Sequence, residues 1–375
     1  EFLIDECHKR NMEFHAWLNP YRASTAGNTR FADSHIYNKH PEWFVTYNKQ
    51  ILFDPGLPES RQFINKVVRD IVSRYDVDAI HMDDYFYPYP TAGMPFPDDK
   101  SFQKYGLNKG YTNAQRSDWR RENVNTLIRE LKRTILLTKP WVRFGISPFG
   151  IYRNKKSTPD GSGSDTNGLQ NYDDLYADIL HWVKEGWIDY NMPQIYWEID
   201  HPAADYITLI QWWNKNATLE GPHLYIGQDV ARTMKASQLT RKMRYERALS
   251  KVKGNCFWPA NELLWNNKGV ADSLKRNYHR YPALIPAYTH MHNRAPQEVK
   301  KLKKEWTADG YMLHWKAEQS PTNPELSNPA KIVKITRNTR YLMPYDNGKK
   351  KYRYIVTAVD RFHNENTGKS IKVKL

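Results

Sequence analysis

The sequence predicts an α/β fold, a TIM-type (β/α)8 barrel, followed by a small all-β domain. Three observations indicate this arrangement. Runs rich in β-branched and aromatic residues alternate six times with segments of helical apolar spacing. Long loops follow three of these runs, at 21–57, 88–113 and 150–172, as they do on the active-site face of a barrel. Beyond Pro286, short alternating strands are separated by turn residues.

The length and composition agree with two globular domains. The chain has 375 residues, of which 40% are hydrophobic and 26% are charged, and we divide it into a barrel domain over 1–286 and a small domain over 287–375. No apolar run approaches the roughly 18 residues of a membrane span. The two cysteines are too few for a disulfide framework or a cysteine metal site.

The sequence predicts six parallel strands. They are predicted at 12–20, 77–87, 142–149, 188–197, 223–230 and 255–261. A closed barrel of this type has eight strands, and residues 2–10 have the pattern of a helix, so we expect two further strand and helix units upstream of residue 1. No G-x-G-x-x-G or P-loop sequence follows any strand, which argues against an open nucleotide-binding sheet.

Three helices are predicted between these strands, at 58–75, 114–138 and 175–186. Pro58 suits the first position of a helix, Pro140 stops the second helix, and Gly186 ends the third. The expected buried residues are Phe63, Val67, Ile71 and Val72 in the first helix, and Trp119, Val124, Ile128, Leu131 and Ile135 in the second.

The C-terminal segment has strand periodicity at 298–317, 331–338, 352–366 and 370–375. It resembles the fibronectin type III fold, in which a tryptophan such as Trp315 fills the core and a strand such as 352–360 crosses it. This resemblance implies a β-sandwich that acts as a spacer or a docking module.

The basic charge is concentrated in this small domain. The whole chain has a net charge of +15, and from His290 onward 18 Lys and Arg stand against 8 Asp and Glu, a net charge of +10. The distribution argues against a nucleic-acid partner for the barrel. Lysine runs are more often solvated faces than binding sites, and contact with an anionic envelope surface is the alternative left open.

Asp83 and Asp84 are the main candidates for chemistry. Both follow an apolar strand, at the end where a barrel places its active site. Strand alternation places His81, Asp83 and Tyr85 on one face. Two adjacent carboxylates are costly to bury unless they have partners or a function.

Other strand ends contribute polar and aromatic side chains that suit a sugar. Amides and carboxylates bind hydroxyl groups, while Trp and Tyr rings stack on the apolar face of a pyranose. The candidate substrate-binding residues are His15, Asn19, Arg22, His81, Tyr85, Tyr87, Gln194, Tyr196, Trp197 and Trp258.

Cleavage of a glycosidic bond needs a proton donor and a second carboxylate. We assign the second role to Asp83, whose carboxylate would act as nucleophile or base. Asp84, Glu198 and Asp229 are eligible as the acid, and Asp84 is favoured because its neighbouring carboxylate would raise its pKa. Glu198, beside Trp197, is the rival.

Two alternatives remain open besides hydrolysis of a bacterial or host-derived polysaccharide. A barrel could bind glycan without cutting it. A metal-dependent glycan-modifying enzyme could use Asp83 and Asp84 with His15 or His81, although no paired-His spacing occurs at a strand end. We therefore expect no metal and no cofactor, and a polysaccharide or oligosaccharide as the partner.

The strings FHAWLNPYR, HMDDYFYP, GISPFGIYRN and NMPQIYW add a resemblance. With them the chain resembles the bacterial glycosyl-hydrolase-like family of the YngK type, once described as a domain of unknown function. The resemblance implies a TIM-type barrel with Asp83 and Asp84 as its acidic centre, and relatives that act on peptidoglycan glycan strands. It also implies an exported protein, periplasmic or at the cell surface, and a lipoprotein anchor upstream of residue 1.

Overall fold

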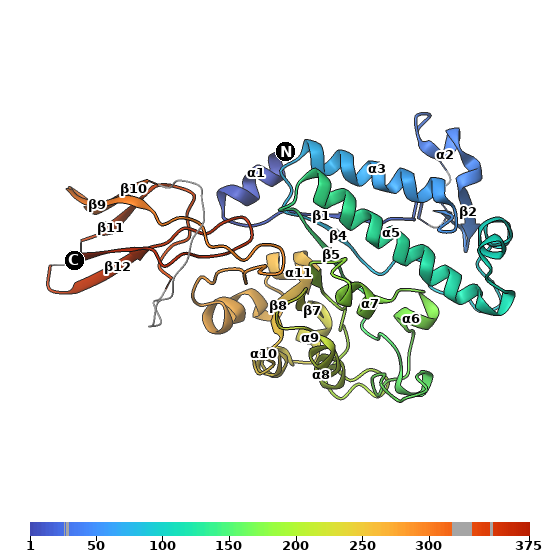
Figure 1. Ribbon diagram of the computed structural model, residues 1–375. Coiled ribbons are helices and arrows are strands. Elements are labelled where there is room, and N and C mark those ends of the chain that lie inside the picture. The colour runs from blue at the N-terminus through green and yellow to red at the C-terminus, as the bar shows by residue number, and fades with distance from the viewer. Residues whose placement is uncertain (26, 28–29, 317–331, 346–347) are drawn as a thin grey trace. The chain divides into compact units, whose positions relative to one another are not determined.

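The computed structural model describes residues 1–25, 27, 30–316, 332–345 and 348–375 (Figure 1). The chain divides into two compact units. The first consists of Glu1 and Glu13–Asp272, and the second of Phe2–Met12 and Ser273–Leu375. The helix predicted at 2–10 is confirmed as α1 (Phe2–Lys9), and it belongs to the second unit.

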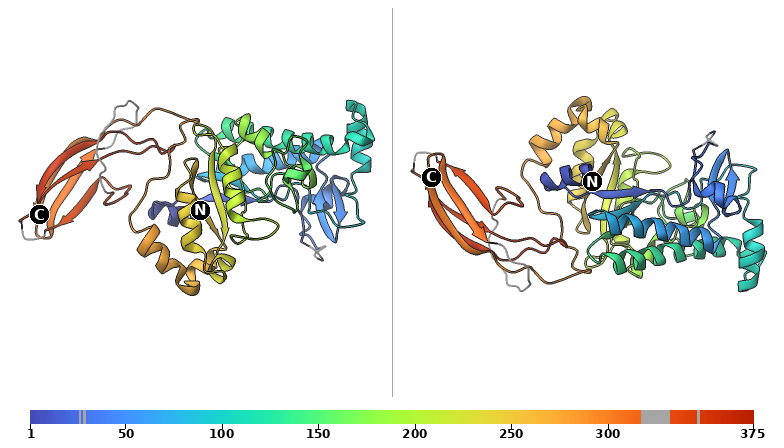
Figure 2. Two further views of the ribbon diagram at one scale, coloured as in Figure 1. Left: turned by 90° about the horizontal axis from the view of Figure 1, so that it is seen from below. Right: turned by 90° about the horizontal axis from the view of Figure 1, so that it is seen from above.

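All six predicted parallel strands are present in the first unit. They are β1 (His15–Leu18), β4 (Ala79–Met82), β5 (Arg143–Ile146), β6 (Tyr190–Asn191), β7 (His223–Asp229) and β8 (Val252–Trp258). They pair in the order β1-β4-β5-β6-β7-β8 and form a curled parallel sheet (Figures 1 and 2). Neighbouring strands in this sheet run parallel to each other. Their carboxyl ends therefore meet at one edge of the sheet.

The closed eight-stranded barrel is not formed within the described residues. In that part of the chain no pairing joins β1 to β8, so both remain edge strands of an open sheet. Six strands are two short of the number that closes a barrel of this type. Two further strands upstream of residue 1 stay a prediction.

Helices and short turns connect the strands. The helices of the first unit are α2 (Ile36–Lys39), α3 (Pro58–Arg74), α4 (Asp99–Ser101), α5 (Arg116–Thr138), α6 (Asn171–Asp174), α7 (Ile179–Lys184), α8 (Tyr206–Asn216), α9 (Val230–Lys235), α10 (Leu239–Arg247) and α11 (Ala260–Leu264), and α12 (Val270–Ser273) continues across the unit boundary. Single turns of 3-10 helix lie at Pro41–Trp43, Leu107–Lys109, Asn113–Gln115, Lys155–Ser157 and Asn267–Gly269, and π-helical turns at Phe102–Gly106 and Leu274–Tyr278. None of the described helices combines the length and apolar character that crossing a membrane requires.

The two long helices, α3 and α5, pack side by side against the sheet (Figure 1). All five residues predicted for the buried face of α5 are buried. The stripe predicted for α3 is confirmed only at Val72, since Val67 is 38% exposed and the other buried apolar residues are Ile64 and Val68. The predicted third helix is shorter than expected, because α7 begins only after Asp178, whose carboxylate accepts from the amide of His181.

The loop over 21–57 contains a small hairpin of its own. Its strands are β2 (Phe44–Tyr47) and β3 (Gln50–Phe53), which pair antiparallel. The aromatic rings of Phe44 and Phe53 lie 4.2 Å apart across this pair. A structured hairpin therefore follows the first strand end.

The second unit contains two antiparallel sheets (Figure 2). One has the order β11-β10-β9, with β9 (Lys300–Thr307), β10 (Gly310–Lys316) and β11 (Arg340–Pro344), and the other pairs β12 (Lys351–Val356) with β13 (Lys369–Lys374). Leu313, Met343, Val373 and Leu375 form their common core, and Trp315 packs against it.

The strand predicted at 331–338 is wrong. Residues 332–338 form no strand, residue 331 lies outside the described residues, and the real strand is β11. The described residues of the second unit form five strands, fewer than the seven of an immunoglobulin-type sandwich. The fibronectin type III identity therefore stays a prediction.

Candidate functional site

Asp83 and Asp84 directly follow β4 at the carboxyl edge of the sheet. The preceding Ile80 and Met82 are fully buried, and the two aspartates are only 6% and 2% exposed. A carboxylate loses its hydration at such a position, so the protein must either supply donors or leave a proton on the group.

Asp84 is supplied with donors. The Tyr89 hydroxyl donates to its Oδ2, and the Gln194 side chain also hydrogen-bonds to the carboxylate. Gln194 is fixed in turn by a 2.8 Å hydrogen bond from its Nε2 to the carbonyl oxygen of Ser147. Burial raises the pKa of Asp84, and the Tyr89 and Gln194 hydrogen bonds oppose that rise.

Asp83 has a less complete set of partners. Its Oδ1 is buried, and within the described residues no donor reaches it. Burial and then the neighbouring charge of Asp84 raise the pKa of Asp83 to about 6, while a hydrogen bond from the Tyr85 amide and, less strongly, the charge of Arg22 act in the opposite direction. Asp83 thus retains a proton at a higher pH than an exposed aspartate.

Half-exposed aromatic rings surround the aspartates. Tyr85 and Tyr89 stack with centroids 5.7 Å apart, and the Arg22 guanidinium lies 4.9 Å from the Tyr85 ring centroid. Tyr196 and Trp258 stack at 5.6 Å with their planes 12° apart. Trp258 is 45% exposed and Tyr89 is 40% exposed, so both can contact a ligand beside the carboxyl groups.

Asn19 positions Arg22. Its Oδ1 accepts a 2.9 Å hydrogen bond from the Arg22 amide, which closes the turn after β1. The Asn19 side chain therefore holds the turn that places the Arg22 guanidinium over Tyr85. The contact of both residues with substrate stays a prediction.

His15 and His81 do not lie among the strand-end residues where we expected them to contact substrate. Both lie inside the sheet, where their Nδ1 atoms hydrogen-bond to the Tyr190 hydroxyl at 2.9 and 3.0 Å. Tyr190 can lie there because residue 145 is glycine: a Cβ on Gly145 would come within 1.9 Å of the Tyr190 ring. Burial, with a smaller contribution from His15, lowers the pKa of His81 to about 3, so His81 is neutral.

Tyr87 is a second correction. It is only 1% exposed and packs against Phe96 and Tyr176 with centroid distances of 5.1 and 5.0 Å. Strand alternation ends after Asp84, and the following turn directs Tyr87 into the core of the loop. It cannot contact a sugar in this structure.

Asp229, one of the acid candidates, has a local structural role. It caps α9, where its Oδ1 accepts from the amide of Arg232 at 2.9 Å. Its Oδ2 lies 3.5 Å from the Arg232 Nε. Both oxygens therefore have partners within the first turn of the helix.

Glu198 lies near a buried lysine. Burial lowers the pKa of Lys242 to about 8. The charge of Glu198 acts in the opposite direction, because it favours the protonated lysine. The Lys242 Nζ donates to the main-chain oxygen of Trp197 at 2.8 Å. The Trp197 ring packs against Phe149 at 5.4 Å, so Trp197 and Glu198 belong to a segment held by α10.

Two residues of this region were missed from the sequence. Tyr89, which binds Asp84, is the last of three tyrosines in DDYFYPYP, and nothing in that run distinguishes it from Tyr85 and Tyr87. Lys242 lies in the charged run TRKMRYER, where nothing in the sequence distinguishes the buried Lys242 and Glu246 from the exposed arginines. Only the packing of α10 singles it out.

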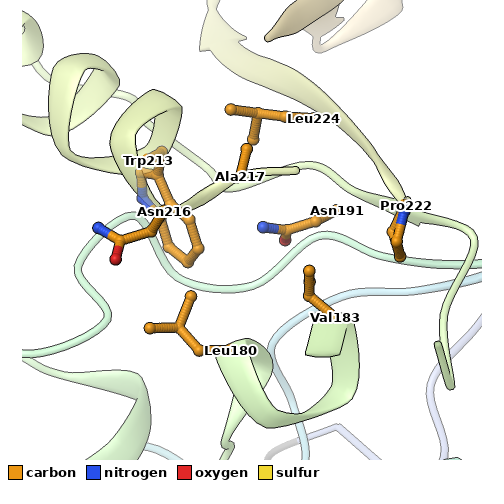
Figure 3. Close-up of a pocket in the computed structure, with 8 residues that line it drawn as sticks. All are labelled: Leu180, Val183, Asn191, Trp213, Asn216, Ala217, Pro222 and Leu224. Atoms are coloured by element: carbon orange, nitrogen blue, oxygen red, sulfur yellow. The ribbon is translucent and has the colours of Figure 1, made fainter. Parts of the chain in front are cut away.

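One enclosed cavity lies away from the aspartates. Figure 3 shows Leu180 and Val183 of α7, Trp213 and Asn216 of α8, and Leu224 of β7 around it. Its volume of about 10 Å³ has room for about one water molecule. It is a packing defect between two helices and the sheet rather than a substrate site.

The metal alternative can be compared with the side chains in place. Within the described ranges, no group of three or more His, Cys, Asp or Glu side chains is arranged to hold a metal ion. The two histidines considered for that role are hydrogen-bonded to Tyr190 instead.

Glycoside hydrolases use paired carboxyl groups beside a bound sugar, and the two buried aspartates and open aromatic rings at these strand ends have the features of such a site. The family described as Glycosyl hydrolase-like 10 matches residues 1–244. The chain belongs to this family, which confirms the resemblance to YngK-type proteins.

Two curated relatives agree with this family. Glycosyl hydrolase YngK of Bacillus subtilis is 40% identical over an alignment of 392 positions. This alignment covers 97% of this chain and 76% of YngK. Glycosyl hydrolase DigH of Escherichia coli is 40% identical over 237 residues, 60% of this chain and 52% of DigH. The match to DigH thus spans about half of that relative's length.

Solved structures similar to this chain include two from glycan-degrading enzymes. The glycoside hydrolase domain of PgaB from Bordetella bronchiseptica has a TM-score of 0.46 at 11% identity and covers 72% of this chain and 76% of that domain. Chitinase ChiA74 from Bacillus thuringiensis has a TM-score of 0.38 at 10% identity, with 85% and 62% covered. It is the family and its named relatives that support hydrolysis of glycans in general.

Proposed function

We propose that this protein hydrolyses O-glycosyl bonds at the carboxyl edge of its parallel sheet, using Asp83 and Asp84. The observation that supports this most is the adjacent pair of aspartates, 6% and 2% exposed, among aromatic rings that remain open to solvent. Burying two carboxyl groups side by side destabilises the fold, so the presence of such a pair indicates a function. Membership of a glycosyl-hydrolase-like family supplies that function.

The hydrogen bonds favour a division of roles opposite to the one assigned from the sequence. Asp84 accepts from Tyr89 and Gln194, and such donors stabilise a carboxylate. Asp83, with a pKa raised to about 6, is suited to donate a proton. In the proposed reaction Asp83 protonates the glycosidic oxygen, and the Asp84 carboxylate acts at the anomeric carbon or on the attacking water.

The sugar would be held by the rings beside the aspartates. Tyr196 and Trp258 offer a stacked pair, and aromatic faces bind the apolar face of a pyranose ring. Arg22 and Tyr85 offer further hydrogen-bond donors close to Asp83. Polar groups at the ends of an apolar platform fix the orientation of such a ligand.

For the substrate we propose the glycan strands of peptidoglycan. We also propose an exported protein, periplasmic or at the cell surface and held by a lipid anchor, because such a substrate lies outside the cytoplasm. The alternatives are a barrel that binds this glycan without cutting it and a metal-dependent glycan-modifying enzyme.

The test is reducing-end release from purified glycan strands, with and without stem peptides. The unsubstituted chain should release reducing ends, and Asp83→Asn and Asp84→Asn should each lower the rate by at least about 100-fold. Asp70→Asn, which alters an exposed carboxylate on α3, is the matched control and should retain the full rate.

Other outcomes separate the alternatives. Binding of strands without any release of reducing ends would favour the non-catalytic reading. Loss of the reaction on adding a chelator, with acetate rather than reducing ends as product, would favour metal-dependent modification and contradict the proposal.

A further inference from the structure

The second unit has an open hollow that the proposed reaction does not use. It is lined by Trp306 of β9, Tyr311 of β10, Tyr345 just after β11, Gly348, and Lys374 of β13. Its volume is about 470 Å³, within the range of about 300–1,000 Å³ that small-molecule sites occupy. Its lining comes from both sheets of the unit.

The aromatic rings in this hollow are packed on each other and still exposed. Trp306 lies 4.8 Å from Tyr311 and 5.1 Å from Tyr345, with interplanar angles of 72° and 89°. Trp306 is 54% exposed and Tyr345 is 50% exposed. A tryptophan and a tyrosine left half in water beside a concave surface are typical of a ligand-binding patch.

The backbone holds these rings in place. Tyr311 pairs directly with Trp306 across one strand and with Met343 across the other, so strand register fixes the floor of the hollow. Gly348 has a φ of +70°, and a Cβ there would come within 2.4 Å of the Tyr345 hydroxyl oxygen. A side chain at residue 348 would therefore displace Tyr345.

The charge around the hollow is positive. Lys374 is part of the lining, and the Lys304 Nζ lies 5.5 Å from the Tyr311 ring centroid while donating to the main-chain oxygen of Lys372. This unit also contains most of the excess positive charge of the chain. The hollow thus offers stacking faces and cations to one ligand.

We propose that this aromatic hollow binds an anionic polysaccharide. Sugar rings would stack on Trp306 and Tyr345, and carboxylate or phosphate groups on the polymer would pair with Lys374 and the neighbouring lysines. Single-stranded nucleic acid combines the same two features, but the glycosyl-hydrolase-like family of the first unit favours a glycan. The proposal requires no cleavage by Asp83 or Asp84.

The experiment is affinity electrophoresis of the full chain in native gels. Carboxymethylcellulose and polygalacturonate are the anionic probes, and hydroxyethylcellulose is the neutral one. The anionic polymers should retard the protein and the neutral polymer should not. The Asp83→Asn chain should be retarded like the unsubstituted chain, so that this proposal and the proposed hydrolysis can fail separately.

Matched variants test the site itself. Trp306→Ala and, as a second variant, Tyr345→Ala should weaken binding at least about fivefold. Tyr281→Ala, which removes a ring of the same 54% exposure elsewhere in the unit, should leave it unchanged. Lys374→Gln should weaken binding about two- to threefold, more than Lys369→Gln at the other end of β13.

Three results would overturn the proposal. The first is no retardation by either anionic polymer. The second is equal weakening by Lys369→Gln and Lys374→Gln while Trp306→Ala and Tyr345→Ala bind normally, since that is diffuse charge attraction. The third is tighter binding of an oligodeoxythymidylate than of either polysaccharide, which would make the hollow a nucleic-acid site.

Discussion

The protonation of Asp83 depends on its immediate neighbours. Asp84 lies next to it in the chain, both side chains are buried, and one Asp83 oxygen has no donor among the described residues. Asp84 by contrast has Tyr89 and Gln194. Burial raises the pKa of both residues, but only Asp84 has side-chain donors that favour its carboxylate form. This difference in partners is the basis for proposing Asp83 as the acid.

The first prediction concerns the pH dependence of the proposed reaction. If Asp83 is the proton donor, the rate should fall as pH rises through about 6, because the raised pKa of Asp83 then leaves the group deprotonated. Initial rates of reducing-end release between pH 4 and 9 measure this. A rate that instead rises through this pH range would assign Asp83 to the base role.

The second prediction concerns stability. The pKa of Asp83 is higher in the folded protein, about 6, than its ordinary value of 3.8, so the folded state binds the proton more tightly and stability falls as pH rises through this window. Asp83→Asn removes that loss. Above pH 6 it should raise the free energy of unfolding by about 1–3 kcal/mol, with no gain below pH 3.8.

Urea unfolding of both chains at pH 7.5 and 3.5 checks the second prediction. A substitution that destabilises equally at both values would show that the Asp83 carboxylate is well solvated or paired in the folded state.

At the scale of elements, the loop after β4 is fastened to α5 by one buried carboxylate. Asp98 is fully buried, and its oxygens accept from Arg120 at 2.7 and 2.8 Å and also from Arg116. The same loop begins with the candidate aspartates. The periodicity of α5 could be read from its apolar residues, but this link between a loop and a helix could not.

The third prediction tests this link. Asp98→Ala leaves two arginines without their buried partner and should lower the free energy of unfolding by about 3 kcal/mol. Asp99→Ala is the matched control, because Asp99 is 74% exposed and pairs with Arg116 at the surface; its effect should stay below about 0.5 kcal/mol. Equal losses for the two variants in urea unfolding would contradict a structural role for Asp98.

At the scale of the whole molecule, the chain has two separate cores. One lies beneath the parallel sheet, and the other joins the two antiparallel sheets through Leu313, Met343, Val373 and Leu375. The first unit excludes Phe2–Met12, which belongs to the second although it begins the chain. A boundary drawn along the sequence alone therefore misassigns this segment.

The fourth prediction follows from the two cores. Leu313→Ala should lower the stability of the second unit by about 2–5 kcal/mol through the cavity it leaves, and Ile226→Ala in β7 should do the same to the first. Calorimetry should show two transitions, each shifted by only one of the substitutions. A single transition shifted by both would mean that the units unfold as one.

The sequence by itself determined the six parallel strands, the helices α3 and α5, the family, and the position of the two aspartates at a strand end. The substrate-binding roles of Asn19, Arg22, Tyr85, Gln194, Tyr196 and Trp258 stay predictions. The strands, the helices and the position of the aspartates follow from local periodicity and from the rule that parallel strand ends meet at one edge. The family was inferred from the resemblance of short strings in the sequence.

The tertiary structure alone decided which side chains have partners. It placed His15 and His81 on Tyr190, buried Tyr87, assigned Asp229 to a helix cap and brought Tyr89 to Asp84. It also left the sheet open and gathered Trp306, Tyr345 and Lys374 around one hollow. These contacts join residues through turn geometry and packing between elements, which no periodicity in the sequence encodes.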